Sequence, residues 1–334
     1  MANVTVLGSG SWGTALAVLL CGNGHDVILW SYLQEEVDEM KRTHRNLKLN
    51  DNLLPDKLHL TADMEEATTN RDLIVFAVPS FATRQTAHNV SSLIPEGQQV
   101  ITVSKGIEEE TLLTQCDIIE QEIPQAQVGI LSGPSHAEEV IVSLPTAVVA
   151  GAKTRQLAVF TQEIFMNDYF RVYTSPDVVG IEVGGSLKNV IALASGMAGG
   201  LGYGDNARAA LITRGLREIT AIATAMGGKA ETLGGLAGVG DLIVTCSSLH
   251  SRNYMAGFHI GEGDTPKEAQ DKVGMVVEGV YSAKAGLALG KKFGIELPII
   301  EKVNQVLFED KPARDGVMEL MKRDKKSEIE GIAW

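Results

Sequence analysis

The feature that most constrains the fold is a glycine-rich turn close to the start of the chain. Gly8, Gly10 and Gly13 make the pattern G-x-G-x-x-G, which follows a β-branched run at 3–7 and opens a helical pattern at 11–23. In this setting the first glycine permits a tight turn, the second lets a pyrophosphate approach the backbone, and the third lets helix and strand pack closely. The first N–H groups of the helix can then bind phosphate. The turn predicts an α/β domain that binds a dinucleotide.

Strand patterns alternate with helical patterns as far as Ser175. The predicted strands lie at 3–7, 26–30, 58–61, 72–78, 99–103, 127–131, 147–151 and 170–174. The predicted helices lie at 11–23, 34–45, 80–92, 110–122 and 154–167. This alternation favours βαβ units, and therefore a Rossmann-type, doubly wound, mostly parallel sheet with helices on both faces.

A different pattern follows Pro176, where Ala, Leu, Met and Gly recur at helical spacing and strand patterns cease. Proline disfavours a continuing helix, and Asp177 can cap a new one. We therefore expect a dinucleotide-binding domain over residues 1–175 and an all-helical substrate-binding and catalytic domain over residues 176–334. The fold class is α/β plus all-α.

Charge and cysteine content exclude several classes of protein. The chain has 29 basic and 42 acidic residues, a net charge of −13, so nucleic acid and anionic lipid are not expected as partners. Cys21, Cys116 and Cys246 are odd in number and widely spaced, which argues against disulfides and zinc sites and fits a reducing compartment. No basic residue precedes Lys41 and no uninterrupted apolar run reaches ~18 residues, so neither a leader nor membrane insertion is expected. The sequence predicts a cytoplasmic protein.

Candidate ligand-binding residues follow the predicted strands of the first domain. Lys105 follows the fifth predicted strand, and Gly133 and Ser135 follow the sixth. Ligands of open α/β sheets bind at the carboxyl ends of parallel strands, so these residues should face the cofactor and the substrate. The spacing of His136 and Glu139 would allow a metal site, but no second histidine lies nearby in the sequence, and no metal is expected.

The predicted helix at 178–198 carries the residue best suited to proton transfer. Glu182 and Lys188 are the only charged residues between Val178 and Tyr203. Lysines are almost never buried without a partner or a task. In a shielded cleft near a second lysine, the pKa of Lys188 would fall and its amine could act as a general base. At a helix edge the same lysine would simply be solvated.

Two loops of the helical domain supply further candidates. Asp241 ends a glycine-rich turn between helices, where it could join the site or only cap a helix. Ser251 can cap the next helix, and Arg252 and Asn253 at its N-terminus make a candidate phosphate site. The alternative for Arg252 is a surface salt bridge.

The end of the second predicted strand leaves the choice of cofactor open. The dinucleotide fingerprint expects an acid there for the 2′-hydroxyl of NAD, but Trp30 is followed by Ser31, Tyr32 and Leu33, with no acid until Glu35. We therefore expect no acid at this position that would repel the 2′-phosphate of NADP, and no adjacent cation that would bind it. Because neither cofactor is favoured, we predict that the protein uses both. The more distant basic residues are Lys41, Arg42, Arg45 and Lys48.

Several runs of the sequence form a recognisable series. In chain order they are Gly8-Ser-Gly-Ser-Trp-Gly-Thr-Ala-Leu-Ala, Val103-Ser-Lys-Gly, Leu131-Ser-Gly-Pro-Ser-His-Ala-Glu-Glu, Gly184-Gly-Ser-Leu-Lys-Asn-Val-Ile-Ala, Ala210-Leu-Ile-Thr-Arg-Gly, Gly238-Val-Gly-Asp-Leu-Ile-Val-Thr-Cys and His250-Ser-Arg-Asn. Together they cover nearly the whole chain, and the series resembles the bacterial NAD(P)-dependent glycerol-3-phosphate dehydrogenase family. The run Ser31-Tyr32-Leu33 departs from the family, because many members carry a His-Arg pair there.

The resemblance implies reversible oxidation of sn-glycerol 3-phosphate to dihydroxyacetone phosphate, with the reverse reaction supplying phospholipid synthesis, and it favours a homodimer. It implies that Lys188 is the proton acceptor, assisted by Lys105 and Asp241. The implied substrate contacts are Lys105, Gly133, Ser135, Lys188, Asp241, Ser251, Arg252 and Asn253. The glycine-rich turn and the end of the second predicted strand add to the cofactor contacts that the resemblance implies. The full set expected for NAD or NADP is Gly8, Gly10, Ser11, Trp12, Gly13, Tyr32, Lys105, Ala137, Arg252, Val276 and Glu278.

Two other functions stay open from the sequence. A β-hydroxyacid or sugar-acid dehydrogenase would share the two-domain plan and the lysine, with a substrate carboxylate in place of the phosphate. A redox-sensing binding protein would keep the nucleotide fold without the chemistry, although Lys188, Asp241 and Arg252 together argue against it. Turnover of dihydroxyacetone phosphate with NADH or NADPH separates all three.

Overall fold

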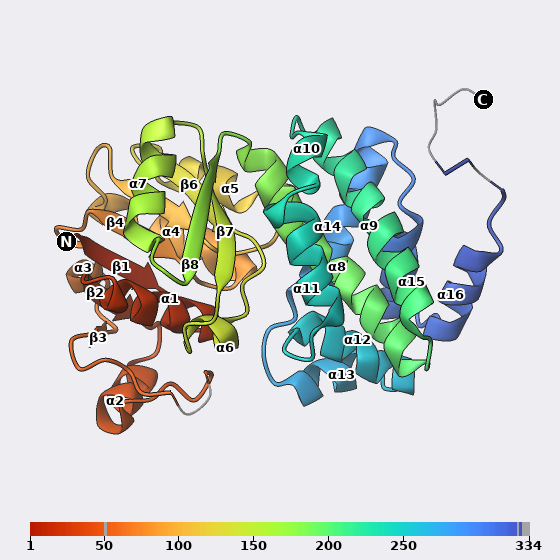
Figure 1. Cartoon of the computed structure of the whole chain (residues 1–334), viewed down its shortest axis with the longest axis horizontal. Coiled ribbons are helices and arrows are strands. Elements are labelled where there is room, and N and C mark those ends of the chain that lie inside the picture. The colour runs from red at the N-terminus through yellow and green to blue at the C-terminus, as the bar shows by residue number, and fades with distance from the viewer. Residues whose placement is uncertain (50–51, 326, 329–334) are drawn as a thin grey trace.

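The computed structural model describes residues 1–49, 52–325 and 327–328. They form a sheet covered by helices, followed by a part built of helices alone (Figure 1). The strands are β1 (Asn3–Leu7), β2 (Asp26–Trp30), β3 (His59–Thr61), β4 (Leu73–Phe76), β5 (Gln99–Thr102), β6 (Gln127–Ser132), β7 (Thr146–Ala152) and β8 (Phe170–Ser175). Every predicted strand is present, and the predicted fold class is confirmed.

The order of the strands fixes where a ligand can bind. The sheet runs β3-β2-β1-β4-β5-β6-β7-β8, and all neighbours pair in parallel except β6 and β7. The chain order reverses between β1 and β4, so the segments that follow these two strands diverge and leave a crevice at their carboxyl ends. Gly8 follows β1 and Ala77 follows β4, which puts the glycine-rich turn at this crevice.

Helices cover both faces of the sheet. They are α1 (Ser11–Gly22), α2 (Gln34–Thr43), α3 (Met64–Thr68), α4 (Thr83–Val90), α5 (Gln115–Glu122), α6 (Ala137–Val140) and α7 (Arg155–Phe165), with short 3-10 turns η1 (Ser80–Ala82) and η2 (Ser91–Leu93). The buried apolar side chains of α1, α2 and α7 pack in one core, and those of α4 and α5 pack in another. The ribbons of α1 and α7 lie on one face of the sheet, and those of α4 and α5 lie on the other (Figure 1).

The structure corrects two of the predicted helices. The helix predicted at 110–122 begins only at Gln115, because Ile107 and Thr114 form an antiparallel bridge and Thr114 then caps α5. The helix predicted at 80–92 is divided into η1, α4 and η2. α3 and α6 were missed, since elements of five and four residues are too short to show a helical period.

The long helix α8 (Val178–Gly200) is the centre of the helical part. Asp177 caps it by accepting a hydrogen bond from the Gly180 N–H at 3.0 Å, as predicted. The other helices are α9 (Asp205–Ala225), α10 (Ala230–Leu233), α11 (Asp241–Ser247), α12 (Arg252–Glu262), α13 (Pro266–Val273), α14 (Glu278–Phe293), α15 (Pro298–Phe308) and α16 (Ala313–Met321), with a π-helical turn η3 (Leu236–Gly240). Of the helices in the described segments, α8 alone is long and apolar enough to cross a membrane, but 94% of its most apolar stretch is buried within the protein.

The backbones of α8 and α12 touch where the two helices cross. A Cβ atom on Gly196 would lie 2.0 Å from the carbonyl oxygen of Tyr254, and one on Gly257 would lie 2.1 Å from that of Leu193. Only glycine fits at such distances. The crossing therefore fixes the start of α12 relative to the polar residues of α8.

Candidate active site

A cleft of about 830 Å³ lies between the carboxyl edge of the sheet and the helical part. The predicted site residues on its walls are Gly8, Gly10, Ser11, Trp12, Tyr32, Lys105, Ser135, Ala137, Lys188, Ser251, Arg252, Asn253, Val276 and Glu278. Three further predicted residues, Gly13, Gly133 and Asp241, contact wall residues from behind. The structure thus brings together in one place residues that are far apart in the sequence.

The glycine-rich turn has the shape that a pyrophosphate requires. Gly8 has a φ of +121°, and a Cβ atom there would lie 2.6 Å from the Ala77 carbonyl oxygen. A Cβ atom on Gly13 would lie 2.0 Å from the carbonyl oxygen of Gly8, whereas at Gly10 nothing lies within 4 Å. Within the described residues, no side chain caps α1 and no acid lies in its first turn, so its N–H groups remain available for an anion. These features fit a dinucleotide.

Two lysines share one buried carboxylate beside the cleft. Asp241 is 1% exposed; its Oδ1 accepts a hydrogen bond from Lys188 Nζ, and its Oδ2 accepts one from Lys105 Nζ at 2.7 Å. Lys188 also donates to Thr245 Oγ1 at 2.8 Å, and Lys105 donates to the Gly133 carbonyl at 3.1 Å. An ammonium group has three N–H donors, so these contacts leave each lysine one donor for a ligand.

The surroundings of Lys188 make its proton exchangeable near neutral pH. Burial is the main cause that lowers the pKa of Lys188 to about 8; the charge of Lys105 adds to this effect, and Asp241 opposes it. A lysine with such a pKa can both accept and donate a proton under ordinary conditions. Because both lysines face a single carboxylate, the cluster keeps a positive charge when both are protonated.

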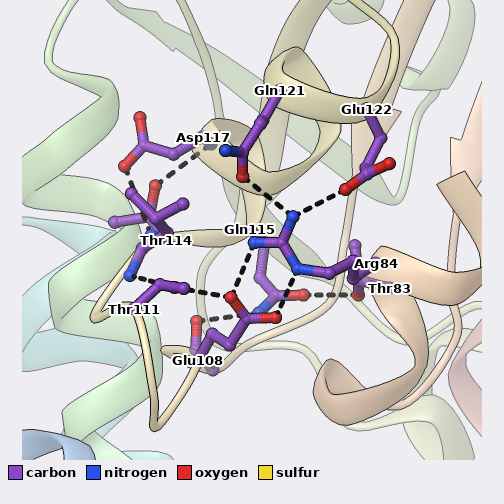
Figure 2. A network of polar contacts seen from close by, with 11 residues as sticks. Thr83, Arg84, Glu108, Thr111, Thr114, Gln115, Asp117, Gln121 and Glu122 are labelled. Carbon is purple, nitrogen blue, oxygen red and sulfur yellow. Dashed lines mark hydrogen bonds and ion pairs between the residues drawn. The ribbon is translucent and has the colours of Figure 1, made fainter. Parts of the chain in front are cut away.

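The segment that carries Lys105 is held by the polar network in Figure 2. Arg84 of α4 donates to Glu108 of this segment at 2.6 Å and to Glu122 of α5 at 2.6 Å. Gln115 Nε2 donates to the backbone carbonyl next to Lys105 at 3.1 Å. These bonds join α4, α5 and the segment after β5, and they support a fixed position for Lys105.

The start of α12 adds an arginine to the wall of the cleft. Ser251 caps the helix by accepting a hydrogen bond from a first-turn N–H at 3.2 Å, and Arg252 occupies the first helical position. Asn253 Nδ2 donates to Asn189 Oδ1 at 3.0 Å, and Asn253 Oδ1 accepts from the Gly279 N–H at 2.8 Å. Asn253 therefore ties α12 to α8 and α14, a structural role beyond its predicted contact with the substrate.

A second contact joins the sheet part to the helical part across the cleft. Glu278, the first residue of α14, accepts hydrogen bonds from the Ser80 N–H at 3.0 Å and from Ser80 Oγ. Burial raises the pKa of Glu278, although these bonds and the charge of Arg252 oppose the rise. Glu278 thus connects the wall near Arg252 to the turn that follows β4.

Two buried polar atoms on the walls are unpaired. In the part of the chain that the structure describes, Trp12 Nε1 and His136 Nε2 have no hydrogen-bond partner, although both residues line the cleft. Native proteins rarely leave such atoms unpaired, which is consistent with a ligand in the cleft. Across the described residues, no group of three or more His, Cys, Asp or Glu side chains is placed to hold a metal.

Sequence reasoning missed an acid at the end of the cleft beside β2. Glu36 of α2 accepts hydrogen bonds from Ser9 Oγ and Ser31 Oγ, both at 2.8 Å, and from Lys48 Nζ at 2.5 Å. The expectation that no acid lies there was wrong, because the acid comes from the helix after the strand and not from the strand end itself. A search of the first turn of that helix would have found it. Tyr32, predicted at this end, lies on the rim and is 81% exposed.

Comparisons with known proteins agree along the whole chain. Residues 3–158 match the family model of the NAD-dependent glycerol-3-phosphate dehydrogenase N-terminus, and residues 177–318 match that of the C-terminus. A protein named glycerol-3-phosphate dehydrogenase [NAD(P)+] from Agathobacter rectalis is 57% identical, with all of both chains covered, and one of the same name from Fusobacterium nucleatum is 53% identical, with 99% of both covered. A crystal structure of glycerol-3-phosphate dehydrogenase from Coxiella burnetii is 39% identical and superposes with a TM-score of 0.93 over 96% of this chain and 99% of the other.

Proposed function

The chain belongs to the NAD-dependent glycerol-3-phosphate dehydrogenase family, and from this premise we propose that it interconverts sn-glycerol 3-phosphate and dihydroxyacetone phosphate with NAD or NADP. The observation that carries the proposal is the pairing of Lys188 and Lys105 with the buried Asp241 beside a cleft that also contains the glycine-rich turn. In the reducing direction the product is the phosphorylated glycerol used for phospholipid synthesis.

Lys188 moves the proton in this proposal. In the oxidising direction its neutral amine accepts the proton of the C2 hydroxyl, and in the reducing direction its ammonium returns a proton to the C2 oxygen. Asp241 holds the lysine in place and stabilises its charged form. Lys105 lowers the pKa of Lys188 and has an N–H free to bind the same oxygen. The nicotinamide, when bound, supplies or accepts the hydride at C2.

The phosphate of the substrate needs a local positive charge, because the chain as a whole carries a net charge of −13. Arg252 supplies it at the N-terminus of α12, where backbone N–H groups also favour an anion. Gly133, Ser135, Ser251 and Asn253 complete the proposed substrate contacts. At the other end of the cleft the cofactor would lie against Gly8, Gly10, Ser11, Trp12 and Gly13, and the remaining proposed cofactor contacts are Tyr32, Lys105, Ala137, Arg252, Val276 and Glu278.

The proposal includes the organisation of the molecule. We divide it at residues 175 and 176, supported by the end of β8 at Ser175 and the start of α8 at Val178. The final residues of the second domain, 329–334, lie outside the described part of the chain. We also propose a homodimer located in the cytoplasm.

A β-hydroxyacid or sugar-acid dehydrogenase is the alternative that shares this catalytic plan. The test is oxidation of NADH and NADPH, followed by absorbance, with dihydroxyacetone phosphate and with 2-keto acids as separate substrates. The proposal expects turnover with dihydroxyacetone phosphate and formation of glycerol 3-phosphate. Turnover with a 2-keto acid alone would favour the alternative, and binding of the cofactor without turnover of either would favour a sensor.

A further inference from the structure

The acid and the lysine beside β2 form a small built site. Glu36 Oε2 accepts from two buried hydroxyls, Ser9 Oγ in the glycine-rich turn and Ser31 Oγ at the end of β2. These two hydroxyls also lie 2.8 Å from each other. Lys48 reaches the other oxygen, Oε1, from the segment that follows α2. All four residues line the cleft, so the site faces the cleft.

The position of the Glu36–Lys48 site in the fold matches the position where a dinucleotide places its adenosine ribose. The Gly8 N–H donates to the Trp30 carbonyl at 3.0 Å, so the end of β2 lies directly beside the pyrophosphate turn. In a Rossmann-type fold the adenosine ribose lies over the end of this second strand. The 2′ position of that ribose is where NAD carries a hydroxyl and NADP carries a phosphate.

Glu36 is a charged acceptor that is held in one place. Burial alone would raise the pKa of Glu36, but hydrogen bonds from Lys48, Ser31 and Ser9 outweigh it and hold the pKa below its ordinary value. A carboxylate has about four acceptor positions, and these three bonds leave one for a further donor. Lys48 uses one of its three donors on Glu36, which leaves donors for an anion.

We propose that Glu36 and Lys48 together select the cofactor at the 2′ position of the adenosine ribose. The inference rests on the proposed use of NAD or NADP. Glu36 accepts a hydrogen bond from the 2′-hydroxyl of NAD while Lys48 stays paired with it. For NADP, Lys48 turns from Glu36 to the 2′-phosphate, and the repulsion between the phosphate and Glu36 offsets part of this gain.

Removing the charge of Glu36 and removing the charge of Lys48 should have opposite effects on the choice of cofactor. Without the carboxylate, NAD loses an acceptor and NADP loses a repulsive neighbour. Without the ammonium, NADP loses its cation, while NAD keeps its hydrogen bond to Glu36. The selection is therefore a balance between two side chains, in which Ser9 and Ser31 hold Glu36 in position.

The test is titration calorimetry of NAD⁺ and NADP⁺ with the full chain and no substrate. We expect Glu36→Gln to lower the ratio of the NADP⁺ Kd to the NAD⁺ Kd about tenfold or more, since one charged contact is worth about a factor of ten. We expect Lys48→Met to raise the same ratio about tenfold and Lys48→Arg to restore it. Added salt should weaken NADP⁺ binding more than NAD⁺ binding in the wild type, and Lys48→Met should remove the difference.

Matched controls come from α2, the helix that carries Glu36. Glu35→Gln removes an exposed negative charge from α2, and Lys41→Met removes an exposed positive charge. Each should change the ratio of the two Kd values less than about twofold. If Glu36→Gln and Lys48→Met alter both Kd values by the same factor, the inference is overturned while the proposed function stands. If the wild type binds neither cofactor, both are overturned.

Discussion

Lys188 lies on a helix whose other buried residues are mostly apolar or glycine, and its hydrogen-bond partners come from other elements. Asp241 and Thr245 belong to α11, and Lys105 follows β5. Burial removes water from the amine, and the carboxylate keeps the charged form accessible. The residue is therefore neither a permanently charged lysine nor a permanently neutral one, which is the property a proton carrier needs.

Replacing this lysine should stop the chemistry and spare the cofactor. We expect Lys188→Ala to lower kcat by ~10²- to 10⁴-fold, the usual loss for a general acid or base. The Kd of NADH, measured by fluorescence, should stay near the wild-type value, because Lys188 is not among the proposed cofactor contacts. Lys291→Ala, on the exposed end of α14, is the control. A Lys188→Ala enzyme with more than half of the wild-type kcat would remove Lys188 from the mechanism.

The pH dependence should have opposite signs in the two directions. Oxidation needs neutral Lys188, so its rate should rise as the pH passes through about 8, and reduction needs the ammonium, so its rate should fall there. The charge of Lys105 helps to lower this pKa, so the residual activity of Lys105→Met should show a midpoint at higher pH. Rate profiles recorded from pH 6 to 10 in both directions check this. Profiles with the same sign in both directions would contradict it.

Of a phosphorylated and an unphosphorylated substrate, only the phosphorylated one should depend on the charge of Arg252. We expect Arg252→Ala to raise the KM for dihydroxyacetone phosphate by ~10- to 100-fold, the effect of losing a hydrogen bond to a charged group. The KM for unphosphorylated dihydroxyacetone should change little, and Arg155→Ala, at an exposed position of α7, should change neither KM value. Equal losses for both substrates would show that Arg252 does not bind the phosphate.

At the scale of elements, the site depends on how closely α12 approaches α8. The glycines at their crossing let the backbones touch, and the first turn of α12 carries the proposed phosphate site. α8 also lies close to other parts of the site. A Cβ atom on Gly184 would lie 2.6 Å from the Ala237 carbonyl oxygen, and one on Gly185 would lie 2.9 Å from Ser132 Oγ. The small residues of α8 thus let η3 and β6 approach the turn before Lys188.

A methyl group at the crossing should disturb both stability and substrate binding. We expect Gly257→Ala to destabilise the protein by ~1–3 kcal/mol through overpacking. For a domain of this size each kcal/mol lowers Tm by ~2–4 °C, measured by calorimetry. The KM for the phosphorylated substrate should rise as well, since Arg252 begins the displaced helix. Gly204→Ala is the control, because no atom lies within 4 Å of a Cβ there. Equal effects of the two substitutions would contradict this packing.

The sequence predicted those helices and strands that have a long periodic pattern or a recognisable capping residue. Regular alternation identified all the strands, and Asp177 was recognisable as a cap from its place after Pro176. The helix start at Gln115 was not predictable, because it depends on a bridge between residues that the sequence does not show as paired. Glu36 was missed because the search for an acid ended with the strand, although Glu36 lies in the first turn of the next helix; the bonds from Ser9 and Ser31 that hold it at the cleft are visible only in the structure.

At the scale of the whole molecule, residues from both the sheet part and the helical part line the cleft, and neither part alone contains all of them. The turn after β1 offers a site for a dinucleotide, and α8, α11 and α12 offer the lysine, the carboxylate and the arginine. Direct contacts cross from one part to the other, between Lys105 and Asp241 and between Ser80 and Glu278. Both contacts are within hydrogen-bond distance, so they hold the two walls of the cleft in fixed positions relative to each other.

The central claim is that this arrangement reduces dihydroxyacetone phosphate. The most direct measurement is the oxidation of NADH and NADPH by the wild-type protein with this substrate, together with identification of the product. We predict stoichiometric formation of glycerol 3-phosphate with both cofactors, and values of kcat/KM for NADH and NADPH within about tenfold of each other, a difference of ~1.4 kcal/mol. Absence of oxidation with dihydroxyacetone phosphate, under conditions where the protein binds either cofactor, would contradict the claim.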